Sequence, residues 1–475
     1  MLRATHSLFM LVLLSLPTAW PTQAAPPNII VIVADDLGYA DLDVQGCEDI
    51  PTPAIDSLAV NGARFTNAYV TCPICAPSRA GLITGRYQNR FGFEDNGGPD
   101  PEPAFGLPDD EVTIAEPLKA AGYRTAFIGK WDMGDKPGSR PNDQGFDQFF
   151  GFLPGVNDYL PAGHPNAYQP NDQPLVNGRS FPIYRNTQVV DEPEYLTDAF
   201  GREAAAFIEH HHDQPFLLYL SFSAVHNPMT ATDRYLDRFM DLPEPRRTYA
   251  AMVSAMDDAV ARVCNTLNKH GITDDTLIFF LSDNGGASGE GVAAPSPADN
   301  TPLSGRKATF WEGGIRVPYI VCWPQRIKPG QVISHNVSSL DILPTAIAAA
   351  NAFYSGKHPP DGTNLLPVLL NQTDEPPHHT LYWRYHGNAA VIQGNWKLIA
   401  FDNGIVQLFN ISRDIGESTN LTQTHPEQVE QLRLLLTAWL KTLPEPAWRR
   451  RKLNEQGHPV YISLPIYEAV CDPAL

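Results

Sequence analysis

The stretch NIIVIVA, residues 28–34, is an unbroken apolar, largely β-branched run with the length of one β-strand. A half-exposed strand would alternate apolar and polar residues, so this run predicts a strand that is covered on both faces. Similar runs lie at residues 215–222, 276–281 and 318–322. Between the runs lie helical patterns at residues 199–211 and 248–269. The alternation predicts an α/β fold in which helices sandwich a large, mostly parallel sheet.

The pattern of predicted elements changes after about residue 355, from long strands and helices to short strands. Short strand-like pieces lie at residues 380–385, 389–393, 396–400 and 407–410, and a helical pattern follows at 427–441. This succession predicts a smaller C-terminal α+β lobe made of an antiparallel sheet and one helix. We therefore expect a main domain at residues 25–355 and a C-terminal subdomain at residues 356–475.

Residues 1–24 have the order of a cleaved secretory signal, with Arg3, an apolar run at 8–16, and the small residues Thr22 and Ala24. The alternative is a membrane anchor. The run is much shorter than the roughly 20 residues that a spanning helix needs, and no other stretch is longer and equally apolar. We expect a secreted or periplasmic protein without a membrane span.

The charge and the cysteines exclude several classes of protein. The formal net charge of −19 argues against nucleic-acid binding, which needs a positive surface field, so an anionic substrate would require a local basic pocket. The 6 cysteines in 475 residues are too few for a disulfide scaffold. They lie at positions 47, 72, 75, 264, 322 and 471.

Polar residues follow several of the predicted strands, where open α/β sheets bind their ligands. They are Asp35-Asp36, Lys130, His226 and Asp283-Asn284. Carboxylate and amide oxygens are the ligands that Ca²⁺ and Mg²⁺ accept, so the two acidic pairs indicate a divalent cation. Taken alone, an Asp-Asp pair is also typical of a helix cap, and Asp-Asn-Gly-Gly of a turn.

A third motif gives these pairs a context. The sequence reads Cys75-Ala76-Pro77-Ser78-Arg79 and continues to Leu82-Ile83-Thr84-Gly85-Arg86. It resembles the type I sulfatases of the alkaline phosphatase superfamily, whose signature is Cys-x-Pro-Ser-Arg followed by Leu-x-Thr-Gly-Arg at this spacing. Cys72-x-x-Cys75 also fits a redox pair or half a zinc site, but no second Cys-x-x-Cys completes a tetrahedral site.

The resemblance extends over nearly all of the mature chain, from residue 28 to about residue 441. The further matching segments, in family order, are GKW at 129–131, GFD at 145–147, YLTD at 195–198, HNP at 226–228, SDNGG at 282–286, and a stretch from 302 to 314. The family likeness implies that a maturation enzyme, either formylglycine-generating or anaerobic, oxidises Cys75 to formylglycine. It also implies that Asp35, Asp36, Asp283 and Asn284 bind Ca²⁺ together with the modified Cys75.

The resemblance also implies roles for the basic residues. Lys130 and Lys307 would hold the sulfate, Arg79 would hydrogen-bond the formylglycine hydroxyl, and His226 would donate a proton to the departing alcohol. The aldehyde would hydrate to a gem-diol, of which one hydroxyl attacks sulfur and the other is deprotonated to release sulfate.

Position 132 departs from the family pattern. Sulfatases usually read Gly-Lys-Trp-His, whereas this chain reads Gly129-Lys130-Trp131-Asp132. A carboxylate could accept the same proton, but it would repel the sulfate unless Lys130 or Arg79 pairs with it. We expect Asp132 to pair in this way and to act as the base, with Asp35 or water as the next candidates.

The sequence therefore predicts a sulfatase, with residues 25–355 as its catalytic domain and a sulfated carbohydrate as its substrate. The run RFGFEDN at 90–96 is similar to that of sulfatases from degraders of marine polysaccharides. Two alternatives stay open. One is a phosphonate monoester or phosphodiester hydrolase of the same superfamily, and the other is a sulfated-glycan binding protein that has lost turnover through Asp132.

Overall fold

The computed structural model describes residues 26–96, 105–161, 163–167, 179–289 and 296–447, and the strands Arg451–Leu453 and Pro459–Tyr461. The predicted signal peptide at residues 1–24 lies outside the described residues. Among the helices that are described, none is long and apolar enough to cross a membrane. Within the same part of the chain the five cysteines are free, and Cys471 lies outside it.

A ten-stranded sheet runs through the main domain in the order β11-β2-β10-β9-β1-β8-β4-β5-β6-β7. The five strands from β9 to β5 are parallel, which confirms the predicted α/β fold. Strand β10 runs antiparallel to β9, and β6 antiparallel to β5, so the sheet is mixed at both sides. The strands are β1 Asn28–Ala34, β2 Ala63–Phe65, β4 Arg124–Lys130, β5 Gln148–Phe152, β6 Ile183–Arg185, β7 Gln188–Val190, β8 Phe216–Ser221, β9 Thr276–Ser282, β10 Tyr319–Cys322 and β11 Gln331–Ile333.

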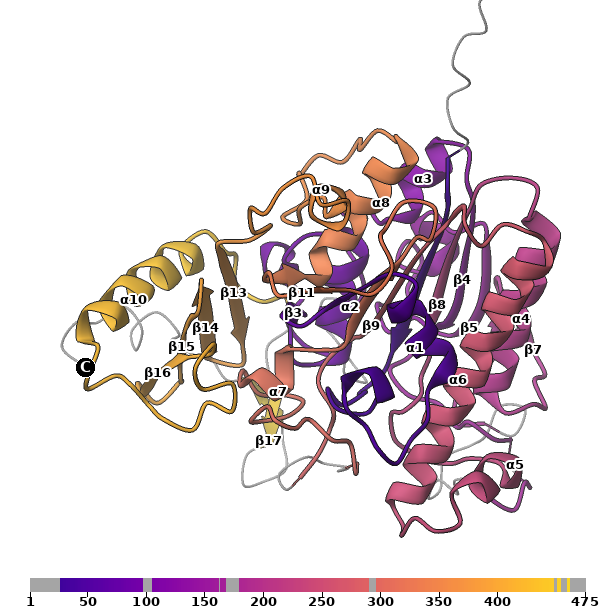
Figure 1. Cartoon of the computed structure of the whole chain (residues 1–475), viewed down its shortest axis with the longest axis horizontal. Helices are drawn as coiled ribbons and strands as arrows, with labels where there is room; N and C mark the ends of the chain where they lie inside the picture. Colours follow the sequence, from indigo (N-terminus) through magenta and orange to yellow (C-terminus); the bar gives the residue numbers. More distant parts are fainter. Residues whose placement is uncertain are drawn as a thin grey trace, which may run out of the picture.

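Strand β1 lies at the centre of this sheet, and all of its residues are buried. Ile30 and Ile32 face the hydrophobic core that contains α1, α4 and α6. Their neighbours Val31 and Val33 face the opposite core, which contains α2, α3 and α8. Both faces are therefore covered by helices (Figure 1), which is why the sequence of this strand does not alternate.

The helices agree with the predicted patterns to within a few residues. The predicted helices at 199–211 and 248–269 correspond to α4 Leu196–His211 and α6 Arg246–Lys269. The remaining α-helices are α1 Pro53–Val60, α2 Cys75–Thr84, α3 Ala115–Ala120, α5 Asp233–Leu236, α7 Glu312–Ile315, α8 Ile342–Ala350, α9 Leu366–Leu369 and α10 Pro426–Leu440. Short 3-10 helices lie at Asp43–Gln45, Gln88–Phe91, Pro141–Gln144, Asp237–Phe239 and Ser339–Asp341.

The C-terminal lobe contains the predicted antiparallel sheet and helix. Its strands are β13 Thr380–Tyr385, β14 Asn388–Gln393, β15 Trp396–Ala400 and β16 Val406–Asn410, paired in sequence order. Two further small sheets pair β3 Ala68–Tyr69 with β12 Val337–Ser338, and β17 Arg451–Leu453 with β18 Pro459–Tyr461. The predicted boundary at residue 355 stays a prediction.

The four-stranded sheet of this lobe is covered on both sides. Val391 and Leu398 pack with Leu436 of α10 on one face. On the other face, Trp383 and Ile399 belong to a core that includes Ile74, the residue before α2. The lobe therefore packs directly against the part of the main domain that carries the signature helix (Figure 1).

Candidate active site

The predicted site residues gather at the carboxyl ends of the central parallel strands. Asp35 and Asp36 directly follow β1, and Asp283 and Asn284 follow β9, whose last residue, Ser282, pairs with Ala34. Lys130 is the last residue of β4. Because neighbouring parallel strands end at one edge of a sheet, these side chains meet there although they are distant in sequence.

The signature segment places Cys75 at the same edge. Cys75 is the first residue of α2, and every residue of this helix is buried. A helix N-terminus carries a partial positive charge, so it favours negative charge that develops at this position. The thiol of Cys75 is itself buried, and burial raises its pKa.

Two buried cations, Arg79 and Lys130, and the largely buried Lys307 pair with three carboxylates around Cys75. Lys130 Nζ lies 2.7 Å from Asp35 Oδ2, and Lys307 Nζ lies 2.6 Å from Asp36 Oδ1. Arg79 Nε donates to Asp283 Oδ2 at 2.8 Å, and Nη2 of the same guanidinium lies 2.7 Å from this oxygen. Lys307 Nζ also donates to Cys75 Sγ at 3.1 Å, so the predicted sulfate-binding lysine reaches the nucleophile position.

The carboxylates of this cluster differ in their electrostatics. Burial alone would raise the pKa of Asp35, but Lys130, His226 and Arg79 together hold it below its usual range. For Asp283, burial outweighs the attraction of Arg79 and raises the pKa to about 7. Of these two carboxylates, Asp35 is therefore the one that the surrounding cations keep ionised.

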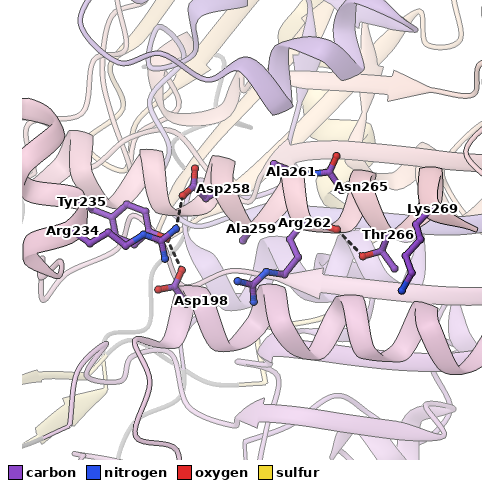
Figure 2. Close-up of a pocket in the computed structure, with 10 residues that line it drawn as sticks. All are labelled: Asp198, Arg234, Tyr235, Asp258, Ala259, Ala261, Arg262, Asn265, Thr266 and Lys269. Atoms are coloured by element: carbon purple, nitrogen blue, oxygen red, sulfur yellow. Dashed lines mark hydrogen bonds and ion pairs between the residues drawn. The ribbon is translucent and has the colours of Figure 1, made fainter.

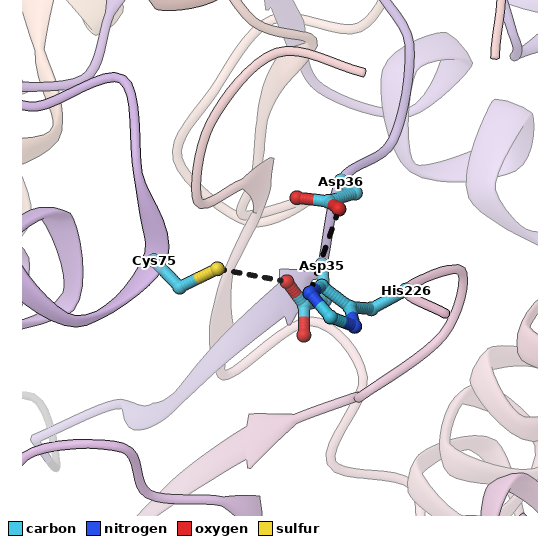
Figure 3. A group of neighbouring side chains, drawn as sticks. All are labelled: Asp35, Asp36, Cys75 and His226. Carbon is cyan, nitrogen blue, oxygen red and sulfur yellow. Dashed lines mark hydrogen bonds and ion pairs between the residues drawn. The ribbon is translucent and has the colours of Figure 1, made fainter. Parts of the chain in front are cut away.

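Asp35, Asp36, Cys75 and His226 each offer one ligand atom, and these four atoms lie within 4.8 Å of one another. Figure 3 shows the sulfur of Cys75 pointing toward Asp35, and His226 lying beside the two carboxylates. The other two predicted ligands adjoin this group through hydrogen bonds. Asn284 Nδ2 donates to Asp36 Oδ1 at 2.7 Å, and Asp283 Oδ1 accepts from the backbone N–H of Asp36 at 3.3 Å.

These residues fit a hard divalent cation. Asn284 is buried, and its Oδ1 atom has no hydrogen-bond donor. A buried acceptor without a donor is costly, and a bound cation would satisfy it. Asp35, Asp36 and Asp283 offer carboxylate oxygens, which are the ligand atoms that Ca²⁺ accepts.

His226 is oriented by the backbone that follows it. Its Nδ1 lies 2.6 Å from the carbonyl oxygen of Asn227, so Nδ1 carries the proton that is donated to this carbonyl. The other ring nitrogen, Nε2, faces the site at 3.8 Å from Asp36 Oδ2. Burial and the charge of Lys307 lower the pKa of His226.

Asp132 lies beside Lys130, one of its two predicted partners, with Oδ2 3.4 Å from Nζ. Its backbone has φ +60°, a left-handed conformation that Asp, Asn and His tolerate better than most residues. Its N–H donates to the carbonyl of Leu153 at 2.9 Å, which fixes the residue at the site. A histidine at this position would therefore be compatible with the same backbone.

Comparison with known proteins agrees with this geometry. The family model described as "Sulfatase" matches residues 27–352. The chain belongs to the sulfatase family. A second family model, for the C-terminal part of N-sulphoglucosamine sulphohydrolase, matches residues 306–444 of this sulfatase. The family assignment makes the protein a sulfuric ester hydrolase of the type I sulfatases within the alkaline phosphatase superfamily.

Individual relatives cover most of the sulfatase chain. It is 34% identical to bovine (Bos taurus) arylsulfatase A over 87% of its length and 88% of the relative. It is 35% identical to mouse (Mus musculus) N-acetylgalactosamine-6-sulfatase over 78% of its own length and 71% of the relative's length. The crystal structure of Ps i-CgsB in complex with k-i-k-neocarrahexaose is 37% identical, has a TM-score of 0.80, and matches 89% of this chain and 94% of that one.

A phosphonate monoester hydrolase of Agrobacterium radiobacter has the same fold. Its TM-score is 0.65 with 20% sequence identity, and the match covers 92% of this sulfatase and 99% of that chain.

The sequence alone did not single out Ser221, the last residue of β8. Its Oγ accepts a hydrogen bond from Arg79 Nη1 at 2.6 Å and donates to the carbonyl of Lys130 at 2.7 Å. Ser221 therefore connects two predicted site residues. The signal was present, because a polar residue at the end of an apolar strand is the same feature that identified Asp35 and Asp283.

A cleft of about 600 Å³ opens above Cys75 in this sulfatase. That volume lies within the range of about 300–1,000 Å³ that is typical of small-molecule sites. The described residues that line it are Cys75, Asn96, Phe105, Asp132, Gly134, Asp135, Leu153, Pro154, Gly155, Val156, Phe181, Pro182, Tyr184 and His226.

A second groove, of about 360 Å³, lies on the helical layer (Figure 2). Its walls come from α4, α5 and α6 and include ion-paired side chains such as Arg234 and Asp258. None of the predicted site residues lines it, so we assign it no part in the chemistry.

Proposed function

We propose that this sulfatase removes sulfate from a sulfated carbohydrate, through a formylglycine made from Cys75, to give the free alcohol and inorganic sulfate. The observation that carries the proposal is Cys75 at the buried start of α2, contacted by Lys307 and lying beside the carboxylates of Asp35 and Asp36 (Figure 3). The likeness to Ps i-CgsB, crystallised with k-i-k-neocarrahexaose, supports a sulfated oligosaccharide such as a fragment of a marine polysaccharide as the substrate.

The modified side chain would supply the nucleophile, because its hydrate carries one hydroxyl that can attack sulfur and a second through which sulfate can leave. Cys75 Sγ marks where these hydroxyls would lie. Lys307 Nζ is 3.1 Å from this atom and is placed to bind a sulfate oxygen. Lys130 Nζ reaches the same carboxylate, Asp35, to which Cys75 donates at 3.6 Å.

Arg79 and Ser221 would keep this arrangement in place. Arg79 is held by Asp283 and Ser221, so its guanidinium is fixed before substrate arrives. His226 Nε2 faces the site and, in the form of the ring that is protonated on both nitrogens, would donate its proton to the departing alcohol oxygen. Asp132, held beside Lys130, would take the proton from the hydroxyl through which sulfate leaves.

Asp35, Asp36, Asp283 and Asn284 would hold Ca²⁺ together with the modified Cys75. The three carboxylates are already balanced by Arg79, Lys130 and Lys307. A bound divalent cation would therefore add positive charge that favours the anionic sulfate and the negative charge on the nucleophile.

The sequence features outside the described residues complete the proposal. Residues 1–24 have the pattern of a signal peptide, so we propose export to the periplasm or the medium. A formylglycine-generating or anaerobic maturation enzyme would convert Cys75. We expect no nucleic-acid partner, because the net charge is −19.

Mass spectrometry of the peptide that contains Cys75 tests the nucleophile. Conversion of the thiol to an aldehyde should lower the peptide mass by about 18 units in protein made with the maturation enzyme. Cys75→Ala should lack both the mass change and the activity. An active preparation that contains only unmodified Cys75 would disprove this mechanism.

Two measurements separate the proposed reaction from its alternatives. Rates on an aryl sulfate and an aryl phosphodiester, compared side by side, should favour the sulfate, whereas the reverse preference would indicate a phosphodiester hydrolase. Sulfate release from a panel of sulfated oligosaccharides should identify the sugar. Tight binding without any release by fully converted protein would instead indicate a sulfated-glycan binding protein.

A further inference from the structure

The cleft above Cys75 has two ends of opposite charge. Its inner end lies at Cys75, where the ammonium group of Lys307 contacts the sulfur atom. Asp132 also lines the cleft and lies beside Lys130, and the outer part is lined by Phe105, Asp135, Phe181 and Tyr184. The sulfate would occupy the inner end, so the outer part faces the alcohol portion of the substrate.

The outer part carries an acidic side chain and no basic ones. Of the described residues that line the cleft, Asp132 and Asp135 are the only ionisable ones apart from Cys75, His226 and the tyrosine, and none is Lys or Arg. Asp132 is only 5% exposed, and its Oδ2 atom lies 3.4 Å from Lys130 Nζ, which balances part of its charge. Asp135 is exposed. Among the described residues that line the cleft, a second anionic group on the substrate would therefore meet the exposed carboxylate of Asp135 and no Lys or Arg side chain.

The remaining walls are largely apolar. Phe105, Phe181 and Tyr184 are partly exposed and line the same cleft, together with Leu153 and Val156. Aromatic rings offer flat apolar faces, and a few polar groups among them fix the orientation of a ligand. Such walls suit the C–H face of a sugar ring, and the exposed carboxylate of Asp135 can accept hydrogen bonds from its hydroxyls.

We infer that the outer part of the cleft selects an uncharged sugar residue, which carries the scissile sulfate but no second sulfate or carboxylate on the side that faces Asp132 and Asp135. The inference rests on the proposed function, because it concerns the alcohol portion of the same ester. Asp135 is the specificity-determining residue, and Asp132 adds to the repulsion of a second anion.

The test compares kcat/KM on three matched esters and one reference. The esters are a hexose monosulfate, the same hexose with a second sulfate, and the corresponding uronic acid monosulfate, and the reference is 4-nitrophenyl sulfate. We expect the neutral sugar to be preferred by at least about tenfold over both doubly charged sugars. The preference should narrow as added salt screens the exposed Asp135.

Asp135→Lys provides the matched variant, because the side chain is exposed and the fold does not depend on it. It should reduce the preference for the neutral sugar about fivefold or more, through changes in kcat/KM for the sugars that are larger than the change for 4-nitrophenyl sulfate. Glu375→Lys makes the same charge change at an exposed residue that does not line the cleft, and should change neither value.

Equal wild-type rates on the neutral and the doubly charged sugars would overturn the inference, as would an unchanged preference in Asp135→Lys. In both cases hydrolysis of 4-nitrophenyl sulfate would leave the proposed function intact. If fully converted enzyme hydrolyses none of the four compounds, the proposed function fails and the inference fails with it.

Discussion

Lys397 on β15 and Glu312 at the start of α7 form an ion pair of 2.7 Å between Nζ and Oε1, and neither side chain is exposed. Lys397 Nζ also lies 2.8 Å from Glu417 Oε1, which is equally buried. Glu312 Oε2 accepts from the hydroxyl of Tyr69 at 2.9 Å. Because Glu312 follows Lys307 by five positions, these contacts tie the C-terminal lobe to the segment that carries a predicted sulfate-binding residue.

Removing Lys397 should destabilise the whole protein. Lys397→Met would leave Glu417 without the Lys397 cation and Glu312 with Arg316 alone, at 3.2 Å. Breaking a buried pair in this way typically costs about 3–5 kcal/mol. Denaturant unfolding should show this loss, whereas Lys441→Met, at an exposed lysine just after α10, should stay within about 0.5 kcal/mol of the parent. Equal stability of the two variants would mean that the lobe is held by its apolar contacts alone.

The same cluster makes stability depend on pH. Burial raises the pKa of Glu417 from its ordinary value of 4.5 to about 7. Between these two values the folded state holds a proton that the unfolded state has released, so the free energy of unfolding falls as pH rises from about 4.5 to about 7.

Glu417→Gln removes this titration while it keeps an oxygen that can accept from the N–H of Glu312. Between pH 5 and pH 8 the parent should lose up to about 3 kcal/mol more unfolding free energy than the variant. Denaturant titrations at several pH values measure the difference. The control is Glu427→Gln at an exposed residue of α10. If the unfolding free energy of Glu417→Gln has the same pH dependence as that of the parent, Glu417 is not the group that titrates.

Substitutions at the predicted cation site should reduce Ca²⁺ binding while the protein still folds. Asp283→Ala would remove the cation ligand and also the partner of Arg79, so we expect it to lose both Ca²⁺ and activity and to be less stable as well. Asn284→Ala is the cleaner change, because the side chain is neutral and its Oδ1 has no hydrogen bond.

For Asn284→Ala we expect Ca²⁺ affinity, measured by calorimetry, to fall at least about tenfold, with activity lost in parallel. The unfolding midpoint in chelator should fall less than in Asp283→Ala, because the change removes the two hydrogen bonds that Nδ2 donates but leaves no buried charge without its partner. Asn268→Ala on the exposed side of α6 should change neither property. If chelated enzyme keeps full activity, the acidic cluster has another purpose.

Asp132 should be needed for repeated turnover rather than for the first one. Asp132→Asn keeps the shape but loses the basic oxygen, so rapid mixing should show a burst of alcohol product followed by little further release. Parental steady-state turnover by Asp132→Asn would make Asp132 a bystander, with Asp35 or water as the next candidate base. If Asp132→His is faster than the parent, the aspartate is an adjustment of specificity instead, since the backbone at φ +60° accepts either residue.

The sequence by itself determined the elements whose signals are local. The apolar run at residues 28–34 is buried on both faces, and the helical pattern at 427–441 corresponds to α10. Both could be predicted because strand burial and helical periodicity depend on the order of apolar and polar residues within a short stretch of sequence. The same holds for the predicted site. Cys75 follows from a continuous motif, and Asp35 and Asp283 follow from their places directly after strands.

Only the tertiary structure decided which of these residues contact one another. Strand β10 runs antiparallel to β9, the last of the five parallel strands, and the apolar sequence of β10 does not reveal this direction. Lys397 pairs with Glu312 across 85 positions, and Ser221 joins Arg79 across 142. Phe181 and Tyr184 line the cleft far from the signature in sequence. Such contacts depend on how whole strands and helices pack, and a lysine, serine or tyrosine has the same local sequence signal whether it lies in a site or on the surface.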